Sequence, residues 1–461
     1  MRWMEAPPNS GGAAASIATR VYHGRLTTSS EAGTRSSSIR LVALASLIGT
    51  TIEWYDFFLY GTAAALVFNA LFFPTFDPLN GTLAAFGTYA VGFVARPLGG
   101  VVFGHYGDRH GRKSMLVLTL VIMGVATFLI ALLPTYARIG VWAPVLLVVL
   151  RVAQGFGVGG EWGGAVLMAV EHAPPSRRGF YGSWPQIGVP AGLLLSTAVF
   201  AVFARMPQET FLAWGWRIPF AASAVLVAVG LLIRSRVMET PAFARQERHE
   251  AGLPVMAVIR QYPRAVLLAM GARFGENAVF YLYSVFVLVY CTQHVGMARG
   301  TVLLGVMMSA ACELVAIPMF GLLSDRIGRR AVYMGGALFT IAYAYPFFAL
   351  LDTGSPPLVW LALILAGTGS HAPMYAPQAA FFSELFGTHV RYTGASIGSQ
   401  LASVFAGGLS PFIATALLAR YGRLSLVLFM AGVASVTVVA LLAASETAGV
   451  DLEHAFRSPR P

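Results

Sequence analysis

Residues 104–113 of the 461-residue chain read GHYGDRHGRK, and residues 321–330 read GLLSDRIGRR. Both stretches contain a glycine, an Asp-Arg pair, a second glycine and two basic residues at the same spacing. A charged motif that recurs in this form within one chain indicates an internal duplication.

Two further pairs of segments occur in the same order along the chain. The segment EWYDFFLYG, which begins at Glu53, is similar to ENAVFYLYS, which begins at Glu276. The other pair is an acid followed seven residues later by an arginine, seen at Glu171 and Arg178 and again at Glu384 and Arg391. Because the three pairs keep their order, the chain is predicted to consist of two related halves.

The composition indicates an integral membrane protein. The chain is 57% hydrophobic and 11% charged, whereas soluble domains are about 25% charged. Apolar stretches of about 20 residues, the length that crosses a bilayer, recur throughout. They lie at 41–70, 82–103, 114–134, 142–170, 181–203, 213–234, 265–291, 301–322, 331–350, 357–379, 392–418 and 424–444. The expected fold is all-α, with 12 transmembrane helices in two pseudo-symmetric six-helix bundles.

The basic residues orient the expected helices. The net charge of +11 suggests a nucleic-acid partner, but most of the 31 Lys and Arg residues fall in the tails and in alternate loops. This distribution follows the positive-inside rule. We therefore expect a multi-pass plasma-membrane protein with both termini in the cytoplasm, a lipid bilayer around it and no nucleic-acid partner.

The expected domain boundaries follow from the apolar stretches. A Ser-, Gly- and Arg-rich N-terminal tail without an apolar segment is either disordered or a mis-assigned start. The predicted parts are the tail 1–40, a bundle 41–234, a cytoplasmic linker 235–264, a second bundle 265–444 and a cytoplasmic tail 445–461. The two cysteines, Cys291 and Cys312, predict neither a disulfide framework nor a metal site.

These motifs resemble those of a known family. GHYGDRHGRK and GLLSDRIGRR resemble the loop signature of the major facilitator superfamily. TIEWYDFFLYG, ARPLGGVVFGHYGDRHGRK and RVAQGFGVGGEWGGA narrow the resemblance to its metabolite:proton symporter branch, whose carriers take proline and betaine, shikimate, 2-oxoglutarate or citrate. The resemblance covers residues 40 to about 445 and implies the two-bundle transporter fold.

The resemblance also implies a cytoplasmic gate. The two motifs are expected to form tight loops, and their charges to pair with the acids of the Glu-x₆-Arg segments while the inside is closed. The gate residues are Asp108, Arg109, Arg112, Lys113, Glu171, Arg178, Asp325, Arg326, Arg329, Arg330, Glu384 and Arg391. The alternative is that these residues only supply positive-inside charge.

Two carboxylates lie within the first expected span. Glu53 and Asp56 are three residues apart and, with Tyr60, form one stripe of the helix. A charge at this depth costs about 2.5–3.5 kcal/mol, so we expect the stripe to face a central cleft. One interpretation is that Glu53 or Asp56 carries a proton, because burial and like-charge repulsion favour the protonated form. The alternative is a salt bridge between helices, with Arg96 or Arg273 as partner.

The second half carries a corresponding set of polar residues. Arg273, Glu276, Asn277 and Tyr281 fall on or near one helix face, and Glu313 lies at similar depth in the next helix. Arg273 either binds an acidic or zwitterionic solute or neutralises one of the two glutamates.

Other polar or aromatic residues within expected spans have two interpretations. Arg151 is expected to line the cleft. His371 either packs or relays a proton, and packing is preferred. Either helix packing or a cage for a quaternary ammonium group explains the aromatic residues Phe57, Phe58, Tyr60, Phe280, Tyr281 and Tyr283.

A glycine motif in the fourth span needs a separate interpretation. Gly155, Gly157 and Gly160 satisfy the GxGxxG spacing of a dinucleotide site, but such a site requires a soluble strand–turn–helix unit. We instead expect these small residues to let two helices approach closely.

The predicted function is secondary active transport. We expect a monomeric proton symporter that takes up a small organic solute by alternating access and uses no cofactor or metal. The solute is either a zwitterionic osmolyte, proline or glycine betaine, or a carboxylate of the shikimate or 2-oxoglutarate type. The alternative is a proton-driven exporter of the same superfamily. An enzyme is not expected, because the sequence shows no nucleophile–base pair and no metal cluster.

Overall fold

The computed structural model describes residues 39–110, 112–159, 162–171, 173–236, 258, 260–386 and 391–450. Nearly all of these residues are helical, and no β-strand occurs among them. The all-α architecture expected from the apolar stretches is confirmed.

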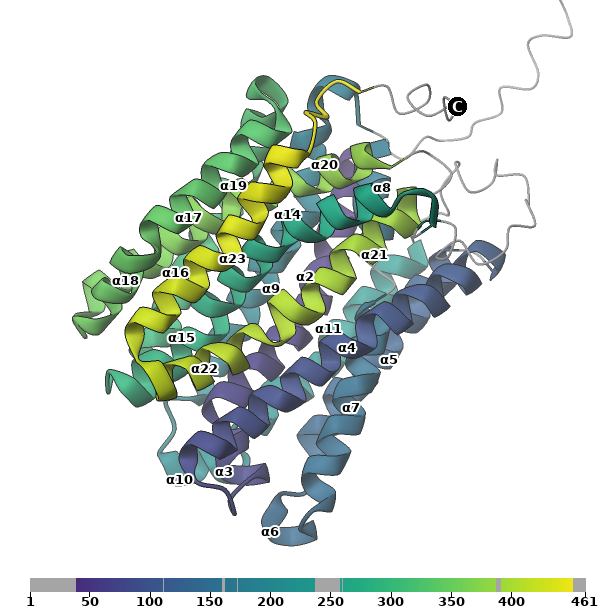
Figure 1. Ribbon diagram of the computed structural model, residues 1–461. Helices are drawn as coiled ribbons and strands as arrows, with labels where there is room; N and C mark the ends of the chain where they lie inside the picture. The colour runs from purple at the N-terminus through teal and green to yellow at the C-terminus, as the bar shows by residue number, and fades with distance from the viewer. Residues whose placement is uncertain are drawn as a thin grey trace, which may run out of the picture. The chain divides into compact units, whose positions relative to one another are not determined.

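The first half of the described chain is built from one series of helices (Figure 1). They are α2 (Ile39–Leu66), α3 (Phe68–Phe72), α4 (Pro78–His110), α5 (Arg112–Leu132), α6 (Tyr136–Ile139), α7 (Trp142–Val158), α8 (Trp162–Glu171), η1 (Pro175–Arg177), α9 (Arg178–Phe203), α10 (Gln208–Thr210), η2 (Phe211–Gly215) and α11 (Arg217–Arg236).

The second half contains more π-helical turns, in which one extra residue is inserted into an α-helix. Its elements are α14 (Pro263–Tyr281), η3 (Leu282–Phe286), α15 (Val287–Val289), η4 (Tyr290–His294), α16 (Arg299–Ile327), α17 (Arg329–Asp352), α18 (Pro356–Leu365), η5 (Ala366–His371), α19 (Ala372–Tyr375), α20 (Gln378–Leu385), α21 (Arg391–Ser403), η6 (Val404–Gly408), α22 (Ser410–Tyr421) and α23 (Arg423–Ala443).

The expected membrane spans coincide with these helices. Within the described ranges, nine helical segments are long and apolar enough to cross a membrane, and two shorter apolar helices, Val117–Leu132 and Trp142–Val158, accompany them. The first expected span falls on α2, the helix that carries Glu53 and Asp56. Each of the twelve apolar stretches read from the sequence overlaps one or more of the described helical elements.

Helix packing joins the two halves along two seams. Helix α9 of the first half packs against α16 of the second, and α4 packs against α21, η6 and α22. Within the halves, α4 packs against α7, α5 against α11, and α14 and α17 against α23. From Ile39 to Val450 the described chain forms one compact unit. Most of the expected linker 235–264 and the two outermost tails lie outside the described residues.

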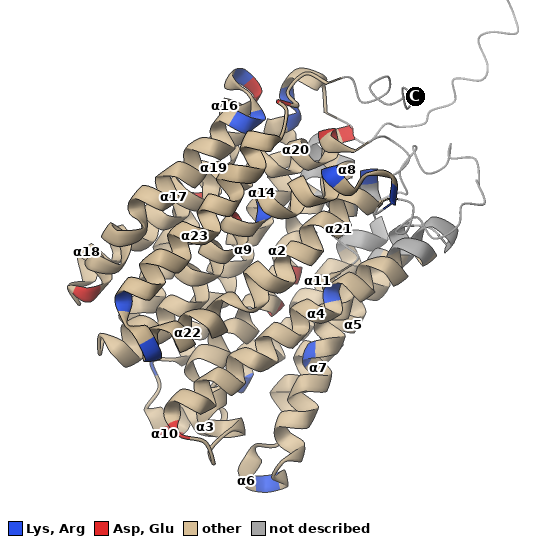
Figure 2. Cartoon of the chain, viewed as in Figure 1, with Lys and Arg blue, Asp and Glu red and all other residues tan. Residues whose placement is uncertain are grey.

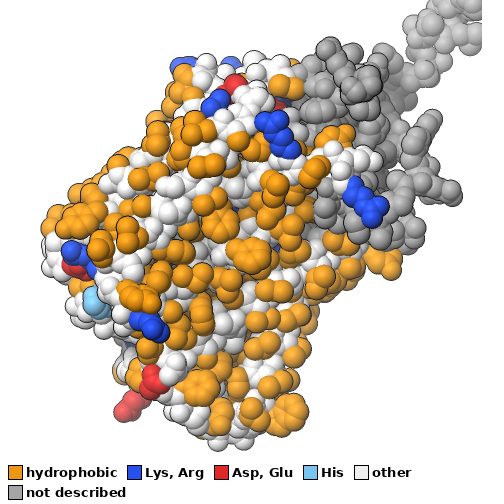
Figure 3. All heavy atoms as spheres, in the orientation of Figure 1, with side chains coloured by type: hydrophobic (Ala, Val, Ile, Leu, Met, Phe, Trp, Pro, Cys, Tyr) orange, Lys and Arg blue, Asp and Glu red, His pale blue; other side chains and the backbone are white. Residues whose placement is uncertain are grey.

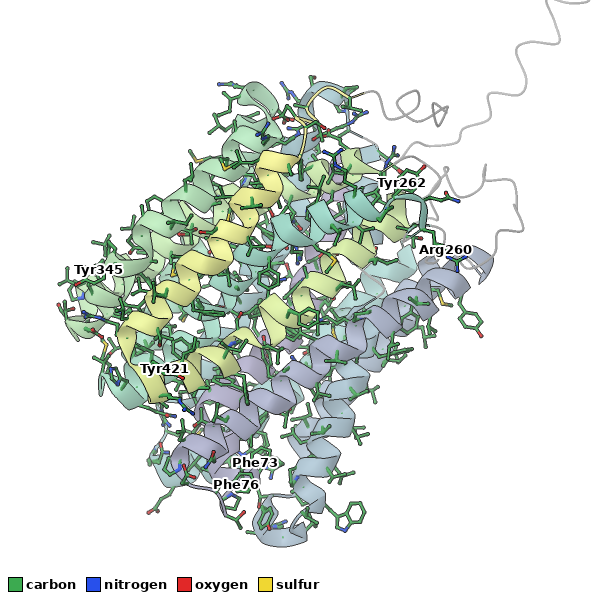
Figure 4. All side chains as sticks on the ribbon, viewed as in Figure 1. Phe73, Phe76, Arg260, Tyr262, Tyr345 and Tyr421 are labelled. Atoms are coloured by element: carbon green, nitrogen blue, oxygen red, sulfur yellow. The ribbon has the colours of Figure 1, made fainter. Side chains whose placement is uncertain are left out.

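Side-chain distribution agrees with a membrane environment. Figure 2 shows charged residues gathered at the two ends of the helices, and Figure 3 shows apolar side chains over the helical face between those ends. Aromatic residues occur at both ends: Figure 4 shows Phe73 and Phe76 beyond α3 and Tyr262 at the opposite end. We call the end that carries residues 104–113 and 321–330 the motif end.

The structure corrects one local expectation. The motifs do not form loops, because α4 continues to His110 and α5 begins at Arg112, while α16 continues to Ile327 and α17 begins at Arg329. In the second motif only Gly328 separates the helices, and its φ of +100° is a conformation that glycine adopts easily. The charged residues therefore occupy helix ends, and the glycine alone makes the turn.

Candidate functional site

A glycine seam brings α4 and α7 into contact. A Cβ added to Gly155 would lie 1.9 Å from the carbonyl oxygen of Gly92, and one added to Gly159 would lie 1.9 Å from that of Arg96. Only glycine permits such an approach of two helix backbones. The described members of the glycine motif, Gly155 and Gly157, lie close to the backbones of neighbouring helices, in agreement with their interpretation as packing residues.

The seam positions Arg151 inside a group of aromatic rings. Its guanidinium carbon lies 4.2 Å from the ring centroids of Phe57 and Tyr60 and 4.7 Å from that of Tyr89. Gly92 makes room for it, because a Cβ there would lie 2.5 Å from Arg151 Nε. Arg151 is completely buried, and its cation–π contacts partly replace the lost hydration.

Arg151 has unused hydrogen-bond donors. Its Nη1 donates to Gln154 Oε1 at 3.2 Å, and Gln154 in turn donates to Thr127 Oγ1 at 2.6 Å. Its Nε and Nη2 find no hydrogen-bond partner in the described part of the chain. Buried donors are normally satisfied, so this side chain presents the hydrogen-bonding edge that a carboxylate accepts in a bidentate fashion.

Arg96 of α4 shows the same arrangement on the same ring. Its guanidinium carbon lies 4.1 Å from the centroid of Phe57 and 4.3 Å from that of Phe93. Its Nε and Nη2 also lack hydrogen-bond partners within the described ranges. We call Arg96, Arg151 and the rings of Phe57, Tyr60, Tyr89 and Phe93 the arginine–aromatic cluster.

The second half covers this cluster. The ring of Tyr281 from α14 lies 5.2 Å from Phe93, 6.0 Å from Tyr89 and 6.3 Å from Phe57. The cluster therefore lies where the two halves meet.

The two acids of α2 occupy different surroundings. Glu53 is buried and electrostatically coupled to Arg96. Asp56 is also buried, and it lies beside Thr127 of α5 and Ser223 of α11, both in the first half. The named neighbours of Asp56 lie on α5 and α11 and that of Glu53 lies on α4, so the two acids are directed toward different helices. That both carboxylates face a central cleft stays a prediction.

Asp56 has no hydrogen-bond partner for either carboxylate oxygen among the described residues. The Thr127 hydroxyl donates instead to the carbonyl oxygen of Met123 at 2.9 Å. Neither Arg96 nor Arg273 forms an ion pair with Asp56 in the described part of the molecule. An ionised carboxylate in such a place is strongly unfavourable, which makes Asp56 a candidate proton carrier.

The second half contains a connected polar network around His371. His371 Nε2 lies 3.1 Å from Glu276 Oε1, and His371 Nδ1 lies 3.0 Å from Glu313 Oε2. The Tyr283 hydroxyl donates to the other oxygen of Glu313. Because both ring nitrogens face carboxylates, a doubly protonated imidazolium satisfies the arrangement.

Arg273 completes this network. It lies 3.6 Å from Glu276 Oε2, donates to Gln378 Oε1, and donates from Nε to Ser403 Oγ at 3.3 Å. Asn277 donates to the same Ser403 oxygen at 2.6 Å. We call Arg273, Glu276, Glu313, His371 and Gln378 the histidine network. Arg273 thus has protein partners on several sides, unlike Arg151.

The sequence interpretation missed His371 and Gln378 as members of this network. A π-helical turn, η5, ends at His371 and shifts the helical phase that a regular wheel assumes. Gly367 in that turn leaves room for Glu313, because a Cβ there would lie 2.4 Å from Glu313 Oε1. The sequence contained one signal for these partners: Glu276 and Glu313 lie within predicted spans, and a buried carboxylate needs a partner.

At the motif end, Asp325 joins the two halves. Its carboxylate accepts the backbone N–H groups of Gly179 at 2.8 Å and Phe180 at 2.9 Å, both in the first turn of α9. A carboxylate at a helix N-terminus is favoured by the exposed N–H groups and the helix dipole. Arg329 Nη1 lies 2.6 Å from Asp325, and Arg329 Nε lies 3.5 Å from Glu384.

The segment that follows α23 covers this closure. Glu446 accepts the backbone N–H groups of Arg329 at 2.8 Å and Arg330 at 3.0 Å, and Thr447 donates to Glu384 at 2.7 Å. Arg178 of the first half donates to the carbonyl oxygen of Val450 at 2.8 Å. Residues 446–450 therefore touch both halves.

Other residues expected at the gate fall into two groups. Glu171 lies 3.3 Å from Arg391, which gives a second ion pair between the halves. The side chains of Asp108, Arg109, Arg112 and Lys113 lie outside the described residues.

The opposite end is also closed. Arg299, the first residue of α16, donates from Nη2 to the carbonyl oxygen of Ala204 at 2.8 Å and from Nη1 to Gln208 at 2.6 Å. Its guanidinium carbon lies 4.5 Å from the ring centroid of Phe211. Contacts between the halves thus exist at both ends, with the buried polar residues between them.

Comparison with known proteins identifies the family. Residues 47–411 match the family model described as Major Facilitator Superfamily. The chain belongs to this superfamily. Its members are transporters rather than enzymes, so the protein is a membrane transporter, and the predicted fold is confirmed.

Curated relatives refine the assignment. The shikimate transporter of Escherichia coli (strain K12) is 45% identical over 404 residues, which cover 86% of this chain and 92% of that protein. The proline/betaine transporter of Escherichia coli (strain K12) is 34% identical over 388 residues, 82% of this chain and 77% of that protein. These relatives confirm the resemblance to the metabolite:proton symporter branch.

Solved structures agree on the fold. The proton:xylose symporter XylE from E. coli, bound to 6-bromo-6-deoxy-D-glucose, aligns with a TM-score of 0.71 at 18% sequence identity and covers 90% of this chain and 98% of that one. At this identity the likeness concerns the fold alone.

Proposed function

We propose that the protein is a secondary active transporter that takes up a small organic solute together with a proton across the plasma membrane by alternating access. The observation that carries this proposal is the buried Asp56, whose carboxylate has no hydrogen-bond partner in the described structure. A buried carboxylate that is stable only when protonated supplies the group that proton coupling requires.

The solute is a zwitterionic osmolyte or a carboxylate metabolite. The relatives named above carry shikimate in one case and proline or betaine in the other. The arginine–aromatic cluster supports a solute that bears a carboxylate, which both classes possess.

Contacts between the halves at both ends support alternating access. The halves, taken as residues 41–234 and 265–444, would rock about the buried site while one end opens and the other closes. Asp325, Arg329, Glu384 and the pair Glu171–Arg391 would hold the motif end closed. With the termini in the cytoplasm, as the basic residues favour, this end is the cytoplasmic one.

The experiment is proton flux into proteoliposomes, measured with a pH-sensitive dye during addition of shikimate, 2-oxoglutarate, proline or glycine betaine. We expect one solute class to drive proton entry, and Asp56→Asn to uncouple solute movement from proton movement. Asp77→Asn, a change at an exposed acid beside α4, is the matched control.

Two results would contradict the proposal. One is intact proton-driven uptake in both Asp56→Asn and Glu53→Gln. The other is solute movement in the direction opposite to proton movement, measured in vesicles of defined orientation, which would identify an exporter.

A further inference from the structure

We propose that the transported solute is an organic anion whose carboxylate is bound by the unused edges of Arg151 and Arg96, and that quaternary ammonium osmolytes are excluded from this seat. This inference rests on the proposed transport function and specifies its substrate class. It follows from three features of the arginine–aromatic cluster.

The first feature is the geometry of the unused donors. In both arginines the donors without partners in the described structure are Nε and Nη2, which point along the same edge of a guanidinium group. This pair matches the two oxygens of one carboxylate. The guanidinium carbons of the two arginines lie 4.1 and 4.2 Å from the centroid of the same Phe57 ring.

The second feature is the local charge. Arg151 makes no ion pair with an Asp or Glu side chain in the described part of the molecule, and its electrostatic neighbours are Tyr89, Tyr60, Arg96 and Tyr281. Arg96 is electrostatically coupled to the carboxylate of Glu53. A completely buried cation without an acid partner is unfavourable by itself, and a bound anion removes that penalty.

The third feature concerns the aromatic faces. A quaternary ammonium group binds over the face of an aromatic ring, but here the protein's own guanidinium groups lie over Phe57, Tyr60, Tyr89 and Phe93. A ligand cation would also be repelled by two positive charges. Phe57 and Tyr60, two of the rings that suggested a betaine cage in the sequence, are therefore already in contact with the protein's own cations.

The test is equilibrium binding to the purified full-length transporter in nanodiscs, measured by isothermal titration calorimetry. The probes are shikimate, its methyl ester, 2-oxoglutarate, proline and glycine betaine. We expect shikimate to bind through its carboxylate. Its methyl ester should bind at least about tenfold more weakly, because the ester loses the charge-assisted hydrogen bonds.

The variants are Arg151→Gln and Arg96→Gln, with Arg138→Gln at an exposed position as the control. We expect each of the first two changes to weaken carboxylate binding by about tenfold to a hundredfold and the control to leave it unchanged. The melting temperature of Arg151→Met provides a second measurement that does not depend on binding. Removal of a buried cation without an acid partner should leave the melting temperature unchanged or raise it, whereas a purely structural arginine would lower it.

The outcomes separate this inference from the proposed function. Saturable binding and proton-coupled uptake of glycine betaine, with Arg151→Gln equal to the wild type, would overturn the anion seat and leave the symporter intact. Carboxylate binding that depends on Arg151 without any proton flux would leave the seat intact and overturn symport. A lowered melting temperature of Arg151→Met with unchanged carboxylate affinity of Arg151→Gln would assign Arg151 to structure and overturn the inference.

Discussion

The two halves share sequence motifs, but their buried polar residues are arranged in opposite ways. In the first half Arg96 and Arg151 keep donors without partners in the described structure, and aromatic rings surround them. In the second half Arg273, Glu276, His371 and Glu313 bind one another directly. With His371 doubly protonated, the formal charges of these four side chains sum to zero.

This difference teaches how a duplicated fold divides its tasks. A satisfied network stabilises a half and needs no ligand, whereas unused buried donors lower stability until a ligand binds them. If the proposed anion seat is correct, the first half binds the solute, and the second half covers the seat with the ring of Tyr281. Four predictions test this comparison, ordered by expected effect.

The largest effect is expected from removing the centre of the satisfied network. His371→Ala leaves Glu276 and Glu313 buried without their shared partner. The free energy of unfolding should therefore fall by about 3–5 kcal/mol. Thermal unfolding in detergent measures it. The deficit should shrink at acid pH, because protonated carboxyl groups do not repel one another.

Ser370→Ala is the control for this prediction. Ser370 is the adjacent buried residue, and its hydroxyl has no hydrogen-bond partner in the described part of the chain. Equal melting temperatures for the two variants would show that the network is not the stabilising element.

The second prediction disrupts the first half through its glycine seam. In Gly155→Ala the new methyl group would overlap the carbonyl oxygen of Gly92, which forces α4 and α7 apart and costs about 1–3 kcal/mol. Carboxylate affinity should fall together with stability, because the seam positions Arg96 and Arg151. Calorimetric binding and thermal unfolding give the two readings.

Gly432→Ala is the control, because Gly432 is an exposed glycine of α23 with open space around it. This change should lower neither the carboxylate affinity nor the melting temperature. Should Gly155→Ala bind the carboxylate as tightly as the wild type, the seam would not position the arginines.

The third prediction weakens the contact between the halves at the motif end. Asp325→Asn removes the charge of the carboxylate that accepts hydrogen bonds from N–H groups in the first turn of α9. The contact between the halves should weaken by about 1–2 kcal/mol. The closed state should open more often. A cysteine introduced at Ala379, which packs near Gly182 of α9, should then react faster with a maleimide in a background without native cysteines.

Asp352→Asn serves as the control at the opposite end, where Asp352 binds Tyr290 and Arg423. An unchanged labelling rate in Asp325→Asn would remove this residue from the closure.

The smallest effect is expected at the segment after α23. Glu446 accepts the first N–H groups of α17, and a cap of this kind contributes about 0.5–1 kcal/mol. Glu446→Gln should lower the melting temperature slightly and raise the labelling rate at the same Ala379→Cys reporter less than Asp325→Asn does. Glu209→Gln, a change at an exposed acid of α10, should have no effect on either reading, and a larger effect of Glu446→Gln than of Asp325→Asn would reverse the proposed ranking.

Much of the fold was predictable because bilayer crossing imposes a length and an apolar composition that are visible in any window of the chain. The duplication was visible for the same reason, since Asp108 and Asp325 recur in identical local patterns. The helix ends were less predictable. Residues 104–113 and 321–330 contain glycine and charge, which suggest loops, yet α4 continues to His110, and in the second motif only Gly328 separates α16 from α17.

The candidate site was predictable by residue but not by partner. Arg151, Arg96, Asp56 and Glu276 stood out because charges are rare inside a membrane. The sequence left Arg273 either as a solute ligand or as the partner of Glu276 or Glu313, and it favoured packing over proton relay for His371. The structure places protein acceptors around Arg273.

The sequence by itself determined the membrane class, the helix positions, the duplication and the set of buried charges, because these depend on local composition and on recurring patterns. Only the tertiary structure decided which buried charges satisfy one another and which remain available. Hydrogen bonds and ion pairs act over a few ångströms between helices far apart in sequence. Their pairing depends on helix rotation, on the π-helical turn before His371 and on the glycine contacts beside Arg151, which no local pattern of residues specifies.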